Sequence, residues 1–247
     1  MDTQERTLDA LLGGRVRLLQ PKSGYRAGMD AALLAAAVEA AAGERVIEAG
    51  CGTGAALLQA AVRSPGARFT GVERAAMALA WAQESIALNE MQEHVQAIEG
   101  DVDAGFAPLG LKAFDAAFSN PPFFDDEAAL RAPHRDKRGA WIAEGGLRAW
   151  TRFLLKAVRE GGRITVIHRA DRLADLLAQL GETAGSFRVR PVHPFADEPA
   201  KRVLVRAVKT GRAPLVLLPP LVLHERGGGP TAEADAILRG EAALGWD

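Results

Sequence analysis

The stretch from Arg45 to Leu58 constrains the fold of this chain more than any other. Its apolar start runs into a turn in which every second residue is glycine, and an apolar segment follows from Ala55. Glycine lets a backbone come close to a ligand and adopt angles that a Cβ would forbid. A strand, a glycine-rich turn and an apolar helix form the first crossover of a doubly wound sheet, where nucleotide-like cofactors bind. The stretch therefore predicts a cofactor site at Gly50, Cys51, Gly52 and Gly54.

The rest of the chain alternates strand and helix signals, which predicts an α/β fold: a doubly wound, mostly parallel sheet with helices on both faces. Helices are expected over Ala31–Ala42 (capped by Asp30), Ala75–Glu90, Leu147–Arg159 and Leu173–Leu180. Strands are expected over Arg15–Leu19, Arg163–His168, Phe187–Val192 and Arg202–Lys209. A length of 247 residues fits one domain, with an N-terminal hairpin and helix (1–43), a core (44–212) and a C-terminal appendage (213–247). We expect the appendage to be loosely packed.

Three acids stand where a cofactor site would need them. Glu48 precedes the first glycine by two residues, an acid that the Gly-x-Gly-x-x-Gly fingerprint of dehydrogenases usually lacks. Glu73 ends an expected strand about twenty residues beyond the glycines, where an acid suits a ribose diol. Asp101 follows the next expected strand and could accept from an adenine amine. Either of the last two alone would more often be a helix cap or a solvated surface acid.

Asn120-Pro121-Pro122-Phe123 closes an expected buried strand, Phe114–Ser119. The Asn carbonyl and a backbone carbonyl of the Pro pair can accept both hydrogens of a planar exocyclic amine, and Phe123 can stack on the ring that carries it. Proline holds the preceding residue in extended geometry, so the acceptors are set in advance. An ordinary turn after a strand is the alternative. Accepting both hydrogens would stabilise the positive charge that develops as the amine is alkylated.

Together these motifs resemble the class I S-adenosylmethionine-dependent methyltransferases, in the branch that methylates amines. The stretches Leu11–Val16, Gln20–Ala31, Ile167–Leu173 and Pro199–Val205 are similar to the bacterial tRNA1(Val) adenine-N6-methyltransferases, which modify the adenine next to the anticodon. The resemblance implies seven strands with the last antiparallel at the edge, S-adenosyl-L-methionine as cofactor and tRNA as partner. It implies a cofactor site made of Tyr25, Arg26, Glu48, Gly50, Cys51, Gly52, Gly54, Glu73, Arg74, Asp101, Val102 and Asn120. For Tyr25 and Arg26, a surface hairpin is the alternative.

The segment between Phe123 and Trp150 is long for a loop in a compact domain, and loops of this length are usually functional or disordered. It follows the reactive motif directly, so we expect its basic side chains to bind tRNA phosphates and help present a flipped base. These side chains are Arg131, His134, Arg135, Lys137 and Arg138. A solvated surface loop is the alternative.

Composition limits other functions. No apolar run reaches the roughly 18 residues that span a bilayer, and the polar start Met1–Arg6 predicts no signal peptide. One cysteine suits a reducing compartment, so we expect a cytoplasmic protein. Five scattered histidines predict no metal site. The net charge of −1 requires any RNA contact to come from local basic patches.

Two other functions remain open. A protein glutamine N5-methyltransferase would use the same amine-holding chemistry, although that branch is associated with Asn-Pro-Pro-Tyr and an N-terminal helical domain. A non-enzymatic RNA-binding protein with a methyltransferase fold is the other alternative, and a cofactor-binding titration would separate it from an enzyme.

Overall fold

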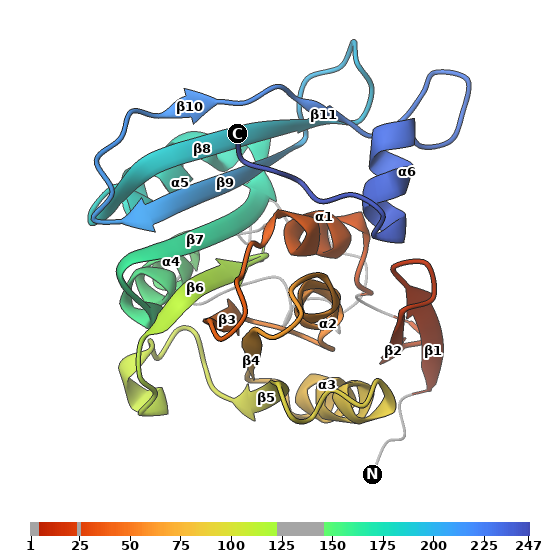
Figure 1. Cartoon of the computed structure of the whole chain (residues 1–247), viewed down its shortest axis with the longest axis vertical. Helices are drawn as coiled ribbons and strands as arrows, with labels where there is room; N and C mark the ends of the chain where they lie inside the picture. Colours follow the sequence, from red (N-terminus) through yellow and green to blue (C-terminus); the bar gives the residue numbers. More distant parts are fainter. Residues whose placement is uncertain (1–4, 24–25, 123–145) are drawn as a thin grey trace.

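The computed structural model describes residues 5–23, 26–122 and 146–247. A central sheet dominates this part of the chain (Figure 1). Five strands run parallel in the spatial order β7-β6-β3-β4-β5. They are β3 (Arg45–Ala49), β4 (Arg68–Glu73), β5 (Val95–Glu99), β6 (Phe114–Ser119) and β7 (Val158–Arg169). The expected doubly wound, mostly parallel sheet is therefore confirmed.

The antiparallel strand is β9 (Arg202–Lys209), the last of the seven long strands of this sheet. The expectation that it lies at the edge is wrong, because β9 is inserted between β7 and β8 (Ala184–His193). Its apolar residues Val203, Leu204 and Val205 are almost fully buried, as suits a strand that is paired on both sides. Two short strands, β10 (Val216–Leu217) and β11 (Leu221–Val222), add to the outer side of β8 and make a nine-stranded sheet within the described residues.

Helices cover both faces of the sheet. α1 (Met29–Ala37), α2 (Ala55–Arg63) and α3 (Ala76–Leu88) contribute to one hydrophobic core, and α4 (Gly146–Ala157) and α5 (Leu173–Leu180) to a second. Phe118 of β6 enters the first core, whereas its chain neighbour Ala117 enters the second. This alternation follows from the period of two along a strand. Among the described residues, no helix is both long and apolar enough to cross a bilayer.

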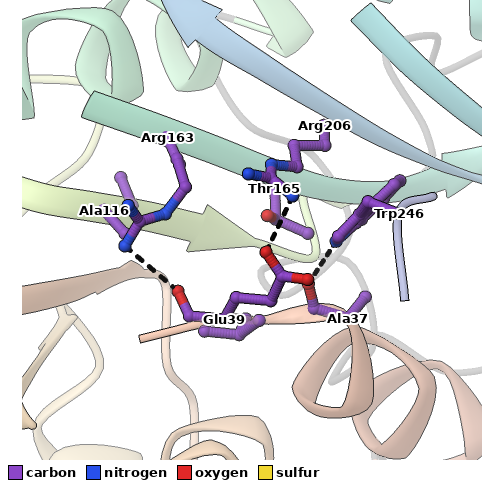
Figure 2. A pocket seen from close by; sticks show the side chains of 9 residues that line it. Ala37, Glu39, Ala116, Arg163, Thr165, Arg206 and Trp246 are labelled. Atoms are coloured by element: carbon purple, nitrogen blue, oxygen red, sulfur yellow. Dashed lines mark hydrogen bonds and ion pairs between the residues drawn. The ribbon is translucent and has the colours of Figure 1, made fainter. Parts of the chain in front are cut away.

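The C-terminal segment is packed, so the expectation of loose packing is wrong. α6 (Ala232–Arg239) buries Ala234 and Ile237, and Leu244 and Trp246 beyond it are each 3% exposed. Trp246 Nε1 donates a hydrogen bond to the Ala37 carbonyl at 2.8 Å (Figure 2). The segment covers apolar surface of α1 that would otherwise face water, which favours burial.

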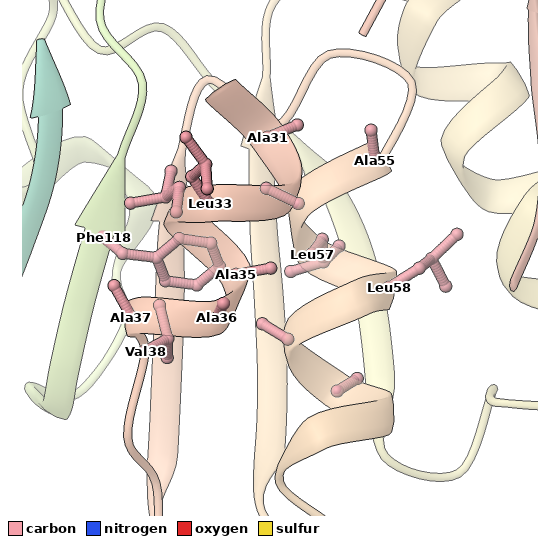
Figure 3. Packing of buried hydrophobic residues seen from close by; sticks show 14 of the residues in the cluster. Ala31, Leu33, Ala35, Ala36, Ala37, Val38, Ala55, Leu57, Leu58 and Phe118 are labelled. Atoms are coloured by element: carbon pink, nitrogen blue, oxygen red, sulfur yellow. The ribbon is translucent and has the colours of Figure 1, made fainter. Parts of the chain in front are cut away.

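α1 is buried on every side because sheet, α2 and C-terminal segment surround it. All seven residues from Ala31 to Ala37 are buried, and they pack with α2 and Phe118 (Figure 3). The helix is shorter than expected: Val38 is extended, at φ −80° and ψ 121°, since the chain must turn toward β3. Asp30 is also not the cap. Gly28 occupies that position, and Asp30 accepts a hydrogen bond from Arg202 Nε at 3.0 Å.

The N-terminal hairpin is a separate two-stranded sheet of β1 (Arg6–Leu11) and β2 (Val16–Pro21). It packs against α3, where the Leu19 backbone N–H donates to Ser85 Oγ at 3.0 Å. Arg15 joins it to the C-terminal segment by donating to the Gly240 carbonyl at 2.7 Å. The division of the chain into hairpin, core and appendage stays a prediction.

Candidate cofactor and substrate site

Strand register brings the expected site residues to one edge of the sheet. Ala49, at the end of β3, pairs with Val72 of β4 and with Ser119 at the end of β6. Glu73 pairs with Glu99 where β4 and β5 end. The glycine turn, Glu73, Asp101 and Asn120 all follow these strand ends. Segments far apart in the sequence thus meet at the carboxyl edge, where ligands of open α/β sheets bind.

The glycines of the turn after β3 share a backbone conformation, and Gly50 and Gly52 differ in what surrounds them. Gly50, Gly52 and Gly54 have φ of 69°, 54° and 90°, in the left-handed region that glycine adopts without strain. A Cβ on Gly50 would lie 2.2 Å from the ring of Trp150, so this glycine is required for packing. A Cβ on Gly52 would meet no described atom within 4 Å, so its open side is accessible to a ligand.

Cys51 is a packing residue in this turn. Its side chain is 5% exposed, and a Cβ on Gly71 of β4 would lie 2.7 Å from its Sγ. Burial, followed by the nearby charges of Glu48 and Glu73, raises the pKa of the Cys51 thiol well above its usual range. The thiol therefore stays protonated and is a poor nucleophile.

Glu73 holds the turn in shape. Its Oε2 accepts from the Gly52 backbone N–H at 2.9 Å, and its Oε1 accepts from the Ala75 N–H at 2.7 Å. Each carboxylate oxygen has a second lone pair, so these bonds leave capacity for hydroxyl donors. The role of Glu73 toward a ribose stays a prediction.

Glu48 lies beneath the turn and is 3% exposed. Burial, and then the charge of Glu73, raises the pKa of the Glu48 carboxyl well above its usual range, although a bond from the Leu57 N–H opposes the shift. Its Oε2 has no hydrogen-bond partner among the described residues. A neutral carboxyl can donate as well as accept, and it avoids placing a second negative charge beside Glu73.

Asp101 is reachable from solvent, with 44% of its side chain exposed. Its Oδ1 accepts from the Asp103 N–H at 3.0 Å and lies 3.8 Å from Arg74 Nη1. Val102 is 6% exposed and belongs to the same core cluster as Val72 of β4. The structure thus places Arg74, Asp101 and Val102 beside the ends of β4 and β5, as expected from the sequence.

Asn120 follows β6 beside the glycine turn. Ser119, directly before it, anchors the strand end by donating from Oγ to the Ala49 carbonyl at 2.8 Å. The side-chain carbonyl oxygen of Asn120 is buried, and no residue in the described part of the chain donates to it. Leaving a buried acceptor unpaired costs about 1–3 kcal/mol, so this atom is suited to a donor that a ligand brings.

Several expected site residues lie outside the described residues. They are Tyr25, Phe123, Arg131, His134, Arg135, Lys137 and Arg138. Arg26 is described, and its guanidinium bonds to the N-terminal hairpin, through Thr7 Oγ1 and the Pro21 carbonyl, both at 2.8 Å, and through Asp9. Its contribution to the cofactor site therefore stays a prediction.

Trp150 is a site residue that was not expected from the sequence. It lies in the helix expected over Leu147–Arg159, as one of several apolar residues on the buried face. Contact between its ring and Gly50 depends on how α4 docks on β3. No local pattern carries that information.

Two surface pockets lie away from this edge. One, between α1, β6, β7 and β9, contains an ion pair of Arg206 Nη1 with Glu39 Oε2 at 2.7 Å (Figure 2). The other is lined by residues at the amino ends of β3, β4 and β5, including Arg45, Arg68 and His94. Neither contains a residue of the expected site. Among the described residues, no group of three or more His, Cys, Asp or Glu side chains could hold a metal ion.

Known proteins with similar sequences are methyltransferases, which agrees with a cofactor site at the carboxyl edge of the sheet. The family model of the methyltransferase small domain matches residues 25–135. Two tRNA1(Val) (adenine(37)-N6)-methyltransferases of Porphyromonas gingivalis strains are 33% identical over 166 residues and 32% identical over 195 residues. The first match covers 64% of this chain and 64% of the relative, and the second covers 75% of each. A release factor glutamine methyltransferase of Chlorobaculum tepidum is 28% identical over 165 residues, which cover 64% of this chain and 56% of the relative.

Solved structures share the fold. A predicted O-methyltransferase from Agrobacterium tumefaciens superposes with a TM-score of 0.72 at 28% identity, covering 87% of this chain and 98% of the other. A Thermus thermophilus 16S rRNA N2 G1207 methyltransferase, solved with AdoMet and guanosine, superposes with a TM-score of 0.60 at 21% identity, covering 83% and 50%.

Proposed function

Because this chain belongs to the tRNA1(Val) adenine-N6-methyltransferase family, a family of S-adenosylmethionine-dependent enzymes, we propose that it methylates the exocyclic N6 amine of an adenine in tRNA. The adenine next to the anticodon of tRNA(Val) is the substrate position that the relatives' names suggest. The observation that carries the proposal is the buried carbonyl oxygen of Asn120 at the carboxyl edge of the sheet, which has no donor among the described residues.

The described residues fit S-adenosylmethionine. Gly52 leaves open space beside the turn, and the exposed carboxylate of Asp101 can accept from an adenine amine. Glu73 lies between them and retains capacity to accept from ribose hydroxyls. When bound, S-adenosylmethionine supplies an electrophilic methyl group on a sulfonium centre.

The role of Asn120 follows from amine chemistry. The N6 lone pair of adenine is delocalised into the ring, so this nitrogen is a weak nucleophile. The Asn120 carbonyl and the Pro121 backbone carbonyl would accept its two hydrogens and stabilise the positive charge that develops as the nitrogen is alkylated. The proton lost afterwards is acidic, so no strong general base is required. Much of the acceleration would come from positioning.

Release factor glutamine methylation is the second candidate, because a relative of that name matches 64% of this chain. A glutamine side-chain amide is also a planar nitrogen with two hydrogens, and Asn120 could hold it in the same way. The two substrates differ in what surrounds the nitrogen, an aromatic base or a peptide.

A parallel substrate assay distinguishes them. The full chain would be incubated with methyl-labelled S-adenosylmethionine and, separately, unmodified tRNA or unmodified release factor. Nucleoside and peptide mass spectrometry would then locate the label. We expect N6-methyladenosine in tRNA and no label in the release factor. Label confined to a glutamine would replace the proposal by the second candidate, and label in neither would reject both.

The basic segment 131–138 is the proposed binding surface for tRNA phosphates. Replacing Arg135 and Lys137 by alanine should reduce the salt dependence of tRNA binding by about one unit of slope for each phosphate that the variant no longer neutralises. Cofactor affinity should not change. A double variant with the parental slope would assign phosphate binding to another surface.

A further inference from the structure

Trp150 has two features that packing of its helix does not explain: its ring contacts the glycine turn, and its indole N–H is buried without a partner among the described residues. It lies in α4, where it is 9% exposed, and it contacts the cofactor turn rather than only the core beneath the helix. An added Cβ on Gly50 would lie 2.2 Å from Trp150 Cη2 and 2.6 Å from Cζ3. The ring therefore occupies the space beside the first glycine and holds the turn from one side.

The indole N–H of Trp150 is buried, yet it has no hydrogen-bond partner within the described ranges 5–23, 26–122 and 146–247. Buried tryptophan N–H groups usually find an acceptor, and leaving a donor unpaired costs about 1–3 kcal/mol. Two acceptors of the site already have donors, because the Ala49 carbonyl accepts from Ser119 Oγ and the Glu73 carboxylate accepts from two backbone N–H groups. Glu48 Oε2 and Asn120 Oδ1 have no donor among the described residues, so neither accepts from the indole N–H. A phenylalanine would fill much of the same space without this cost, although its shorter ring would not reach the positions of Cη2 and Cζ3 beside Gly50.

We propose that Trp150 is a positioning residue of the cofactor site, whose ring supports the turn at Gly50 and whose indole N–H donates to the amino-acid carboxylate of S-adenosylmethionine. The proposal rests on the identity of the cofactor and is independent of the methyl acceptor.

The carboxylate is the acceptor that fits best because it is the one anionic group of the cofactor. The carboxylates of Glu73 and the exposed Asp101 give this edge an acidic character, which opposes a bound carboxylate unless neutral or positive donors face it. An N–H that donates to a carboxylate forms a shorter and stronger bond than one that donates to a neutral oxygen. In a buried site such a bond is stronger again, since water does not compete.

Two ligands distinguish the contribution of the Trp150 indole N–H from that of its ring. S-adenosylhomocysteine carries the amino-acid carboxylate, whereas 5′-methylthioadenosine has the same nucleoside and no amino-acid group. Calorimetry would measure the affinity of both ligands for the wild type, Trp150→Phe and Trp150→Leu. The matched control is Trp246→Phe, which removes an indole N–H from the other side of the sheet.

We expect Trp150→Phe to weaken S-adenosylhomocysteine binding about ten- to a hundredfold, as for the loss of a hydrogen bond to a charged group, and to weaken 5′-methylthioadenosine binding much less, since it loses only part of the ring contact with Gly50. Trp150→Leu should weaken both ligands because the turn also loses its support. Trp246→Phe should change neither affinity.

Equal weakening of both ligands by Trp150→Phe would overturn the carboxylate contact and leave a packing role. Unchanged affinity for S-adenosylhomocysteine would overturn the donor role altogether. Indole N–H signals give a second readout: the chain has four tryptophans, and the signal that disappears in Trp150→Phe should shift with S-adenosylhomocysteine and not with 5′-methylthioadenosine. Neither measurement involves RNA, so a negative result would reject the role of Trp150 without bearing on the proposed methylation of tRNA.

Discussion

Trp150 and Trp246 lie on opposite faces of the sheet, Trp150 at the carboxyl ends of the strands and Trp246 beside Ala116 and Arg163 toward their amino ends. Their indole N–H groups differ in one respect. Trp246 Nε1 donates to the Ala37 carbonyl at 2.8 Å, whereas Trp150 Nε1 has no acceptor among the described residues. The same contrast holds for the acids nearby. At the amino edge, Asp115 accepts from the Arg45 N–H at 2.8 Å and from Arg159 Nε at 2.7 Å. At the carboxyl edge, Glu48 keeps one oxygen without a donor from the described part of the chain.

We interpret this contrast as one between groups that stabilise the fold and groups that pair only with a bound ligand. A polar atom that is paired in the free protein contributes to stability, and removing it leaves its partner unsatisfied. A buried atom that is unpaired lowers stability unless binding supplies its partner. We therefore propose that the carboxyl edge has the binding and catalytic roles and that the paired groups at the amino edge stabilise the fold.

The largest expected effect is on catalysis, from Asn120→Ala. This acceptor acts mainly as charge develops on the amine, so single-turnover methyl transfer at saturating cofactor should fall about 100- to 1,000-fold. Cofactor affinity and melting temperature should change little, because no described residue donates to the Asn120 carbonyl oxygen. The control is Asn89→Ala, since Asn89 bonds to the Arg17 backbone through both side-chain atoms. Asn89→Ala should lower stability and leave the rate of methyl transfer unchanged. The reverse pattern in the two variants would contradict the distinction between paired and unpaired polar groups.

The next effect is on cofactor binding, from Gly52→Ala. The added Cβ would enter space that is open in the free protein, so cofactor affinity should fall about tenfold or more, as for an overpacked contact of about 1–3 kcal/mol. The left-handed backbone should cost about 1–2 kcal/mol of stability. Gly110→Ala is the matched control, because Gly110 also has positive φ (64°) and open space around its added Cβ. It should show the same loss of stability with full affinity in calorimetry.

Trp246→Phe should lower stability without affecting the site. The Ala37 carbonyl loses its donor, which costs about 1–3 kcal/mol. For a chain of this size each kcal/mol lowers the melting temperature by roughly 2–4 °C. Trp150→Phe should change the melting temperature of the free protein little, because removing a buried N–H that bonds to no described residue offsets the packing that the smaller ring loses. A larger loss for Trp150→Phe than for Trp246→Phe would contradict the distinction between the two edges.

The smallest expected effects are on the pH dependence of the free energy of unfolding, to which Glu48 and Asp115 should contribute slopes of opposite sign. The Glu48 pKa is raised in the folded state, so the native protein binds more protons than the unfolded chain above the unfolded pKa, and stability falls as pH rises there. Glu48→Gln should remove that fall and stabilise the protein near neutral pH. The Asp115 pKa is lowered, chiefly by the Arg45 N–H, so its contribution is present above the unfolded pKa and is lost in acid.

Asp115→Asn should therefore destabilise the protein at neutral pH and have less effect in acid. Urea unfolding of both variants across the pH range would measure the two slopes. Slopes of the same sign would contradict the assignment of paired and unpaired acids to the two edges.

The local elements were predictable from the sequence, because strand, turn and helix signals depend on neighbouring residues. The run Arg45–Leu58 identified β3, the glycine turn and α2, and the expected ranges of α5 and β9 match the structure. Carboxyl ends of parallel strands meet at one edge, so the grouping of Glu73, Asp101 and Asn120 also followed from the sequence.

Only the tertiary structure decided which distant segments touch. It inserted β9 between β7 and β8, packed Trp246 on α1 and placed the Trp150 ring against Gly50. These contacts depend on sheet register and helix docking, which join residues far apart in the chain and leave no periodic signal in either segment. Whether a buried polar atom has a partner is decided by the same contacts. The difference between the structural and the functional edge therefore lies in the three-dimensional packing, although each residue type could be read from the sequence.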